Sequence, residues 1–200
     1  MMKTNRKTET EIRLTASEVR LGGKDKKESS RRVEGYALLF ETPSDALDFE
    51  EIILPGALDG VIERSNIFAL LNHDSSRGIL ARSKKGKGTL KLEVDSKGLL
   101  YSFDAPKTTL GDELLEYLKR GDVSESSFAF TVKDDDWEKV GGNTRRTIRK
   151  IDQIFDVSPV YDAAYSKTTV SARAKERKTK AEELATYYAE LNKGIDSLNY

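Results

Sequence analysis

The spacing of apolar residues predicts a chain built mainly of β-strands. Short apolar or alternating stretches bounded by turn-forming residues are typical of strands, and they recur along the central part of the sequence. These stretches span residues 31–40, 49–55, 67–71, 90–94, 99–103 and 123–133. The sequence DSKG at 95–98 joins two of them and predicts a β-hairpin. Residues 144–161 predict a further long strand or a broken pair of strands.

Helical spacing appears at two places between these strands. Thr109 and Asp112 resemble a capping box, and Gly121 can end the helix that follows. Its apolar stripe consists of Leu110, Leu114 and Leu118. A short helical turn is expected through residues 56–64, after Pro55. We interpret the charged stretch 134–142, which ends in two glycines, as a connection. The pattern as a whole predicts a mainly β fold with helices, of the α+β class.

Changes in composition divide the chain into three parts. Residues 1–30 are polar, and we expect a flexible N-terminal arm that holds one strand at most. The domain is expected to span 31–173. Residues 174–200 alternate in charge, and their apolar side chains have helical spacing, which predicts a helical C-terminal tail.

Composition excludes several kinds of chemistry. The 200 residues include no Cys and one His, so a disulfide framework, a thiol nucleophile and a multi-His metal centre are excluded. The 34 basic residues balance the 34 acidic ones, which argues against a nucleic-acid partner. No apolar run is long enough to span a membrane, and no secretion signal is visible, so we expect a cytosolic protein without a membrane partner.

His73 and two serines are the first candidates for catalysis. His73 follows the apolar run 67–71, so we expect its ring at a partly exposed strand end. A lone histidine is more often structural, and a serine in a strand usually only bonds a neighbour. Adjacent strand residues face opposite sides of a sheet, and Phe128 shares a face with Ser126. If the phenylalanine fills the core, Ser127 points away from it.

A carboxylate that could orient the imidazole is expected on the strand after the serines. Asp152 and Asp156 are four residues apart, which predicts the same face, with Ile151, Phe155 and Val157 opposite. A carboxylate beside an imidazole fixes its tautomer and stabilises the imidazolium. The alternative for either aspartate is that it is an ordinary surface charge. Asp74 is badly placed because it directly follows His73.

An ordered set of short strings resembles the prohead maturation proteases of tailed bacteriophages. The strings are Gly35-Tyr36-Ala37 with Phe40, Glu51 to Ala57, Leu70-Leu71-Asn72-His73-Asp74, Asp95 to Leu99, Leu118 to Gly121, Ser127-Phe128-Ala129-Phe130, Asp156 to Val160, and Ala164-Tyr165. Each string alone is unspecific, but their order and separations over residues 30–173 are hard to obtain otherwise.

This resemblance implies a serine endopeptidase with the fold of the herpesvirus assembly proteases, a mostly antiparallel β-barrel. It assigns the general base to His73 and the nucleophile to Ser127, with Ser126 as the alternative. The third member is expected to be acidic, at Asp156 or alternatively at Asp152. The herpesvirus analogy hints at residues 145–146 as the source of oxyanion donors. No cofactor or metal is implied.

The resemblance also implies the partners. The expected substrates are the scaffold-like part of the major capsid protein and the protease itself, cut inside the prohead in the host cytoplasm. A homodimer is possible by the same resemblance. Self-cleavage is expected to give a product beginning near residues 25–32 or ending near 170–185. The rival hypothesis is a non-enzymatic assembly module of the capsid interior that keeps the same fold.

Overall fold

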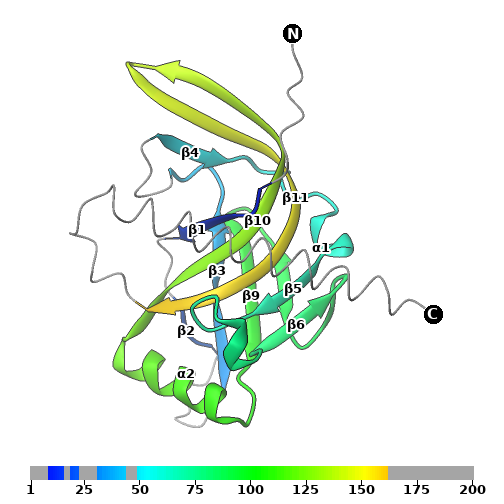
Figure 1. Ribbon diagram of the computed structural model, residues 1–200, viewed down its shortest axis with the longest axis vertical. Helices are drawn as coiled ribbons and strands as arrows, with labels where there is room; N and C mark the ends of the chain where they lie inside the picture. The colour runs from blue at the N-terminus through cyan, green and yellow to red at the C-terminus, as the bar shows by residue number, and fades with distance from the viewer. Residues whose placement is uncertain (1–8, 16–18, 23–30, 44–48, 162–200) are drawn as a thin grey trace.

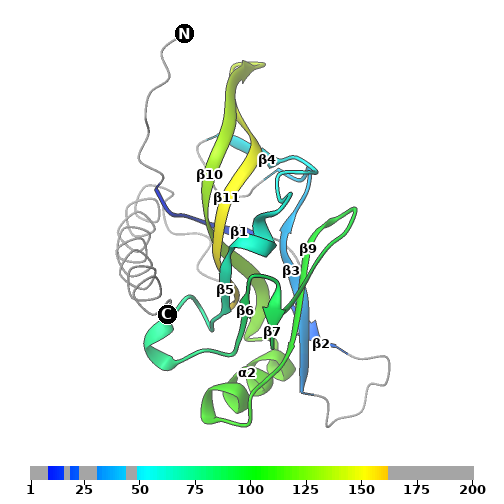
Figure 2. The ribbon, with the colours of Figure 1, turned by 90° about the vertical axis from the view of Figure 1, so that its right-hand side faces the viewer.

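The computed structural model describes residues 9–15, 19–22, 31–43 and 49–161, which form two β-sheets and a few helices (Figures 1 and 2). The seven-stranded sheet has the order β1-β10-β11-β5-β6-β7, and β4 also pairs with β11. Its strands are β1 (Glu11–Thr15), β4 (Glu50–Ile53), β5 (Asn66–Ala69), β6 (Ala81–Lys84), β7 (Lys87–Gly88), β10 (Val123–Val140) and β11 (Asn143–Tyr161). The four-stranded sheet has the order β2-β3-β9-β8. Its strands are β2 (Arg20–Leu21), β3 (Arg32–Leu39), β8 (Lys91–Val94) and β9 (Gly98–Asp104).

The two sheets share one apolar core and touch through their backbones. Buried side chains from both sheets form it, with Tyr101 and Phe103 from β9 and Phe128 and Phe130 from β10 among the largest. Backbone bonds also cross between the sheets, such as Val19 N–H to the Ser124 carbonyl at 2.9 Å. Strand pairing in the described part of the chain nevertheless leaves two open sheets. The mainly β class with helices is confirmed, whereas the predicted closed barrel is not found there.

The pairing of β10 with β11 is longer than the sequence predicts. Asp134–Val140 was expected to be a connection, but these residues continue β10, and only Gly141 and Gly142 form the turn. Side chains of opposite charge form ion pairs between the two strands. Arg149 forms one with Asp134 at 3.0 Å, and Arg146 forms one with Asp135 at 2.7 Å. Cross-strand ion pairs of this kind stabilise a ladder that carries few apolar side chains. The resulting hairpin extends away from the body of the molecule (Figures 1 and 2).

The ladder with β10 passes over three residues of β11, Arg149, Asp152 and Phe155, and each of these bulges interrupts the alternation. Ala129 pairs with Asp156 and Phe130 with Ile154, so Phe155 is the extra residue between these two pairs. Asp152 is passed over in the same way, between the pairs Thr131–Gln153 and Val132–Ile151. Each bulge inserts one residue and reverses the facing of those beyond it. The predicted placement of Phe155 is therefore wrong. It packs against Ala129 in a second small cluster, apart from the core that holds Ile151 and Val157.

The predicted helix at 109–121 is confirmed as α2 (Thr109–Arg120), with a different cap. The Thr108 side chain caps its N-terminus by accepting the Gly111 N–H at 3.3 Å, in place of the predicted Thr109. Gly121 ends it in a left-handed conformation with φ of 78°. The short helical turn expected within 56–64 is present as α1 (Val61–Arg64), after a series of turns. A 3-10 turn, η1, spans Ser75–Arg77. No helix in the described ranges is long and apolar enough to cross a membrane.

Residues ahead of position 31 take part in both sheets. β1 pairs antiparallel with β10, and β2 pairs antiparallel with β3. Two strands are therefore present where one at most was expected, and both pair with strands that follow residue 31. The predicted domain end at residue 173 and the helical tail at 174–200 lie outside the described residues.

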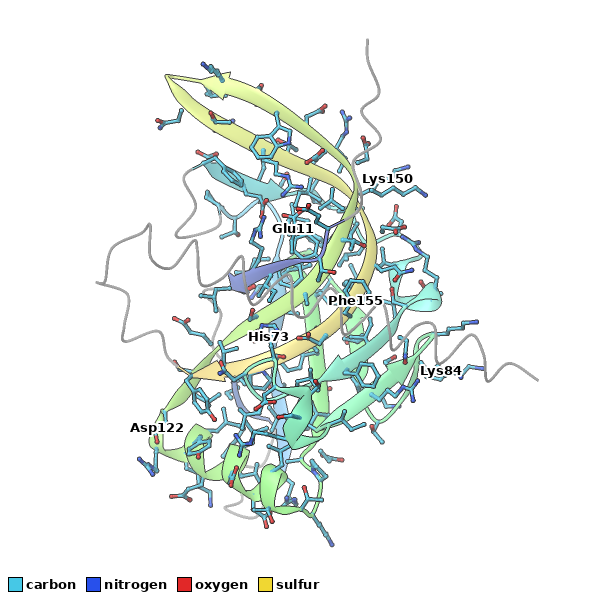
Figure 3. The ribbon with its side chains drawn as sticks, in the orientation of Figure 1. Glu11, His73, Lys84, Asp122, Lys150 and Phe155 are labelled. Atoms are coloured by element: carbon cyan, nitrogen blue, oxygen red, sulfur yellow. The ribbon has the colours of Figure 1, made fainter. Side chains whose placement is uncertain are left out.

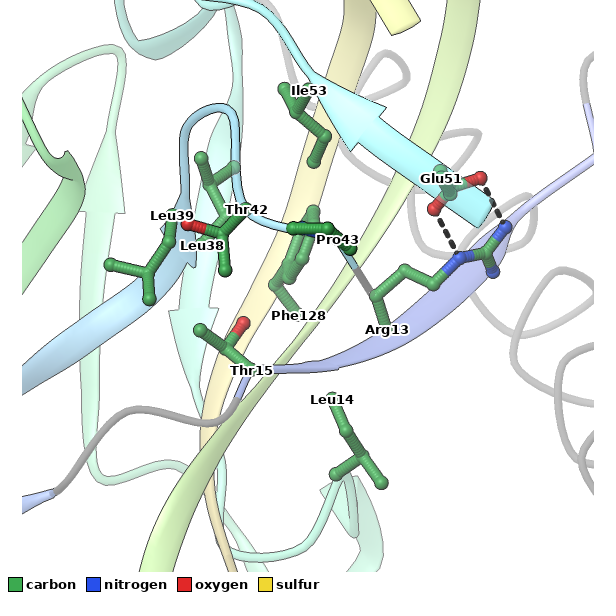
Figure 4. A pocket seen from close by; sticks show the side chains of 10 residues that line it. All are labelled: Arg13, Leu14, Thr15, Leu38, Leu39, Thr42, Pro43, Glu51, Ile53 and Phe128. Atoms are coloured by element: carbon green, nitrogen blue, oxygen red, sulfur yellow. Dashed lines mark hydrogen bonds and ion pairs between the residues drawn. The ribbon is translucent and has the colours of Figure 1, made fainter. Parts of the chain in front are cut away.

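Four charged side chains form an ionic cluster where β1, β4 and β11 meet. Glu51 accepts hydrogen bonds from Arg13 at 2.6 Å and from Arg146 at 2.9 Å, and it is only 1% exposed. Glu11 accepts from Arg146 at 2.9 Å and forms an ion pair with Arg13 as well. Figure 4 shows the contact between Arg13 and Glu51. The cluster joins three strands that lie far apart in the sequence.

We expect the free energy of unfolding to fall on acidification because of Glu11. Burial alone would raise the pKa of its carboxyl, but the hydrogen bond from Arg146 and the charges of Arg13 and Arg146 outweigh burial and bring it below the ordinary value of 4.5. A carboxyl whose pKa is lowered by folding stabilises the folded state above its unfolded-state pKa. That contribution is lost as the pH falls through the folded-state pKa. Urea unfolding between about pH 6 and pH 3 measures this dependence. The slope should be smaller in Glu11→Gln, and an equal slope in both proteins would contradict the assignment.

Candidate active site

The structure brings His73, Ser127 and Asp156 into one hydrogen-bonded chain. His73 Nε2 lies 2.6 Å from Ser127 Oγ, and His73 Nδ1 lies 2.6 Å from Asp156 Oδ1. Ser127 is on β10 and Asp156 on the neighbouring strand β11, whereas His73 follows β5, the next strand of the same sheet. Figure 3 shows His73 beside these two long strands. All three residues are buried, with exposed fractions of 1% for Ser127, 7% for His73 and 0% for Asp156.

A left-handed turn places His73, not a strand end as the sequence analysis expected. β5 ends at Ala69, and Asn72 and His73 have φ angles of 56° and 59°. Asn and His are among the residue types that adopt this conformation most often. The Asn72 N–H donates to the carbonyl of Pro159 on β11 at 2.9 Å, and the Asp74 N–H closes the turn on Leu71 at 3.1 Å. The turn directs the imidazole back over β11, so its expected partial exposure is replaced by burial.

Ser126 and Ser127 lie on opposite faces of β10, as alternation predicts. The Ser126 hydroxyl is in the core, 3.0 Å from the hydroxyl of Tyr101. Burial raises the pKa of the Tyr101 phenol, although the hydrogen bond with Ser126 partly opposes that effect. Ser126 is also close to Gly35, where an added Cβ would lie 3.2 Å from its Oγ. The structure therefore brings Ser127 to His73 and leaves Ser126 on the core side.

Of the two aspartates on β11, Asp156 contacts the imidazole and Asp152 does not. Asp152 lies at a bulge, where its backbone carbonyl accepts a hydrogen bond from Arg64 Nε at 2.9 Å. Asp74, expected to be badly placed, accepts from the Ser76 N–H at 3.0 Å and caps η1.

The suggested oxyanion region at residues 145–146 is far from this site. Arg146 pairs with Trp137, whereas Ser127 pairs with Ser158. Ten residues of β10 separate Trp137 from Ser127, about 30 Å at the rise of a strand. The side chains of Arg145 and Arg146 instead form ion pairs with Glu50 and Glu51. The hint drawn from the herpesvirus analogy is therefore wrong for this chain.

Two contacts of this site were not foreseen from the sequence. Ser158 Oγ donates to Asp156 Oδ1 at 2.7 Å. Ser127 Oγ lies 2.9 Å from the backbone carbonyl of Arg13 on β1, which competes with His73 Nε2 for the single hydroxyl proton. The signal for Ser158 was available, because residues two apart on a strand share a face. No comparable signal exists for Arg13, which reaches the site only through the pairing of β1 with β10.

Chemically, the arrangement can move a proton from a hydroxyl to a base. A serine hydroxyl becomes an effective nucleophile when an adjacent base accepts its proton, and a third group that holds the base in place completes the unit. The imidazole lies within hydrogen-bond distance of both other groups. In the described ranges, no three side chains of His, Asp or Glu gather in a way that could hold a metal ion.

A small pocket near β1 does not include the three candidate catalytic residues (Figure 4). Its volume is about 40 Å³, and Arg13, Thr15, Leu38 and Phe128 are among the residues that line it. That volume suits a few water molecules and is too small for a peptide. None of His73, Ser127 and Asp156 lines it.

Comparison with known protein families agrees with the resemblance seen in the sequence. No curated protein matches the chain. Among solved structures, the capsid assembly protease of bacteriophage T4 is similar at 9% identity and a TM-score of 0.48, over 78% of this chain and 99% of that chain. The family described as caudovirus prohead serine protease matches residues 17–183, well over half of the sequence. The chain therefore belongs to the family of caudovirus prohead serine proteases.

Proposed function

We propose that this chain is a serine endopeptidase in which Ser127 is the nucleophile, His73 the general base and Asp156 the residue that orients the imidazole. The observation that carries the proposal is the buried hydrogen-bonded chain from Ser127 through His73 to Asp156. It involves the only histidine of the sequence, so no other imidazole can act as base within one chain. Membership of a serine protease family supports the same assignment.

The proposed reaction is peptide hydrolysis by acyl transfer. Ser127 Oγ attacks the scissile carbonyl while His73 Nε2 accepts its proton, and the imidazolium then gives that proton to the departing amine. Water attacks the acyl-enzyme in the second half of the cycle. His73 again accepts a proton and returns it to Ser127 as the acid product leaves. Asp156 keeps the proton on Nδ1, so that Nε2 is free to accept, and stabilises the imidazolium in both halves.

The proposed substrates are the scaffold-like part of the major capsid protein and the chain itself, cut inside the prohead. Family membership supports this choice, since the family is that of prohead proteases. Self-cleavage is expected to give a product beginning near residues 25–32 or ending near 170–185. An extended and accessible segment is what a protease requires of its substrate.

Co-expression with the major capsid protein tests this function. The parent chain should shorten the capsid protein and itself, and Ser127→Ala should shorten neither. Ser126→Ala is the matched control, because it removes the neighbouring hydroxyl, which lies in the core beside Tyr101. Equal processing by the parent and Ser127→Ala would overturn the proposal. Normal capsid assembly without shortening by any of the three would favour the non-enzymatic assembly module.

A further inference from the structure

Ser158 makes a buried contact with the carboxylate that orients the imidazole. Its Oγ donates a hydrogen bond to Asp156 Oδ1 at 2.7 Å, and the same oxygen lies 2.6 Å from His73 Nδ1. Ser158 and Asp156 both have an exposed fraction of 0%, so bulk water does not compete for this bond. One carboxylate oxygen therefore accepts from a ring nitrogen and from a hydroxyl at the same time.

The place of Ser158 in the sheet explains this contact. It lies two residues after Asp156 on β11 with no bulge between them, so the two side chains share a face. Its ladder partner on β10 is Ser127. Directly opposed side chains of an antiparallel pair have Cβ atoms about 5 Å apart. Ser158 is thus fixed by the same ladder that fixes the hydroxyl proposed to attack the substrate.

The next residue on β11 holds the backbone beside His73. The Pro159 carbonyl accepts the Asn72 N–H at 2.9 Å. The segment Asp156–Pro159 therefore holds the histidine at two points, through its ring and through the backbone of its neighbour. The ring contact remains in place only if the carboxylate keeps its orientation.

On the basis of the proposed function, we propose that Ser158 is a positioning residue that holds the Asp156 carboxylate in the rotamer that orients His73. A carboxylate rotates readily about its terminal torsion, for which the preferences are broad. A second donor on Oδ1 restricts that rotation and keeps Oδ1 facing Nδ1. Without the Ser158 hydroxyl, the buried carboxylate loses a donor and samples other orientations, and the imidazole loses its fixed tautomer. Ser158 itself touches neither substrate nor the attacking oxygen in this role.

Labelling of the full chain by an alkyl fluorophosphonate tests the proposal without a known cleavage sequence. Such a probe phosphonylates an activated serine and releases fluoride, so its rate reports how well His73 activates Ser127. Ser158→Ala should label about 10- to 100-fold more slowly than the parent, the cost expected for a hydrogen bond to a charged group. Ser83→Ala is the matched control. Ser83 is equally buried, and its hydroxyl has no hydrogen-bond partner among the described residues, so the parent's rate is expected.

A spectroscopic readout separates positioning from a general loss of stability. Because the chain has one histidine, the imidazole N–H signals in an NMR spectrum belong to His73. In folded Ser158→Ala, the Nδ1 proton should exchange with water faster than in the parent and in Ser83→Ala. If the alanine variant does not fold, Ser158→Thr tests the role of the hydroxyl, since threonine keeps this group and suits a strand. It should label at close to the parent's rate.

The outcomes distinguish this inference from the proposed function. If the parent does not label, or if Ser127→Ala labels equally, the serine protease assignment itself fails. If the parent labels through Ser127 but folded Ser158→Ala labels at the parent's rate with unchanged exchange at His73, the role of Ser158 is overturned and the protease assignment stands. A folded Ser158→Thr that labels far more slowly than the parent also overturns it.

Discussion

Replacing His73 with alanine is expected to slow peptide-bond hydrolysis by about 10⁶-fold, which leaves no detectable product, and Asp156→Asn by about 10⁴-fold. The two losses differ because the residues act at different distances from the reaction. Without His73, nothing within reach of Ser127 Oγ accepts its proton. With asparagine at 156, the base remains, but the amide favours the wrong tautomer of the imidazole.

The rate at which the purified variants shorten the capsid protein shows whether His73→Ala loses more activity than Asp156→Asn. Asp152→Asn is the matched control, because it makes the same chemical change on the same strand but at a bulge that does not contact His73. It should process the capsid protein at the parent's rate. A large loss in Asp152→Asn with little loss in Asp156→Asn would reverse the assignment of the third residue, and an active His73→Ala would exclude the imidazole as base.

Glu51→Ala is expected to lower the free energy of unfolding by about 3–5 kcal/mol, the largest change in stability that we predict. Glu51 is 1% exposed and accepts hydrogen bonds from two arginines, Arg13 and Arg146. Its removal leaves both guanidinium groups with one partner fewer in a largely buried part of the molecule. The loss comes mainly from the two guanidinium groups, which are left short of a hydrogen-bond acceptor in the interior, and much less from the attraction of the intact pairs.

Urea unfolding of the parent and two variants tests this expectation. Glu138→Ala is the control, since the Glu138 side chain is 58% exposed and 3.9 Å from Arg145. An exposed pair of this kind contributes about 0–1 kcal/mol. The midpoint should therefore fall strongly in Glu51→Ala and little in Glu138→Ala. Equal midpoints would mean that the ionic cluster contributes nothing to stability.

The elements whose apolar residues keep a single strand or helix period throughout were predictable from the sequence. The strand 31–40, the hairpin around DSKG and the helix ended by Gly121 all appear where the pattern indicates. Alternation also separated Ser127 from Ser126, because no bulge lies between Ser126 and the core residue Phe128. The predicted cap of α2 is wrong by one residue, because Thr108 and Thr109 are adjacent and either side chain can accept a hydrogen bond from the first turn of the helix.

Other features depend on contacts that no local pattern reveals. The bulges at Asp152 and Phe155 each reverse the facing of β11, so Ile154 lies in the core although counting from Ile151 places it on the opposite face. The left-handed turn at Asn72 and His73 is stabilised by the Pro159 carbonyl, which lies far along the sequence. The strand at 134–140 forms because its acidic residues meet arginines of β11. Its composition alone suggests a loop.

The order in which the ribosome makes these segments has a consequence for when the proposed chemistry begins. Asp156 comes 83 positions after His73 and lies in the last described strand, β11. A nascent chain that stops short of β11 has the imidazole and the hydroxyl but lacks the carboxylate, the pairing partner of β5 and the carbonyl that holds Asn72. In the proposed mechanism, cleavage can therefore begin only after translation has passed this strand and the strand has paired, and an unfinished chain is expected to be inactive while it is being made.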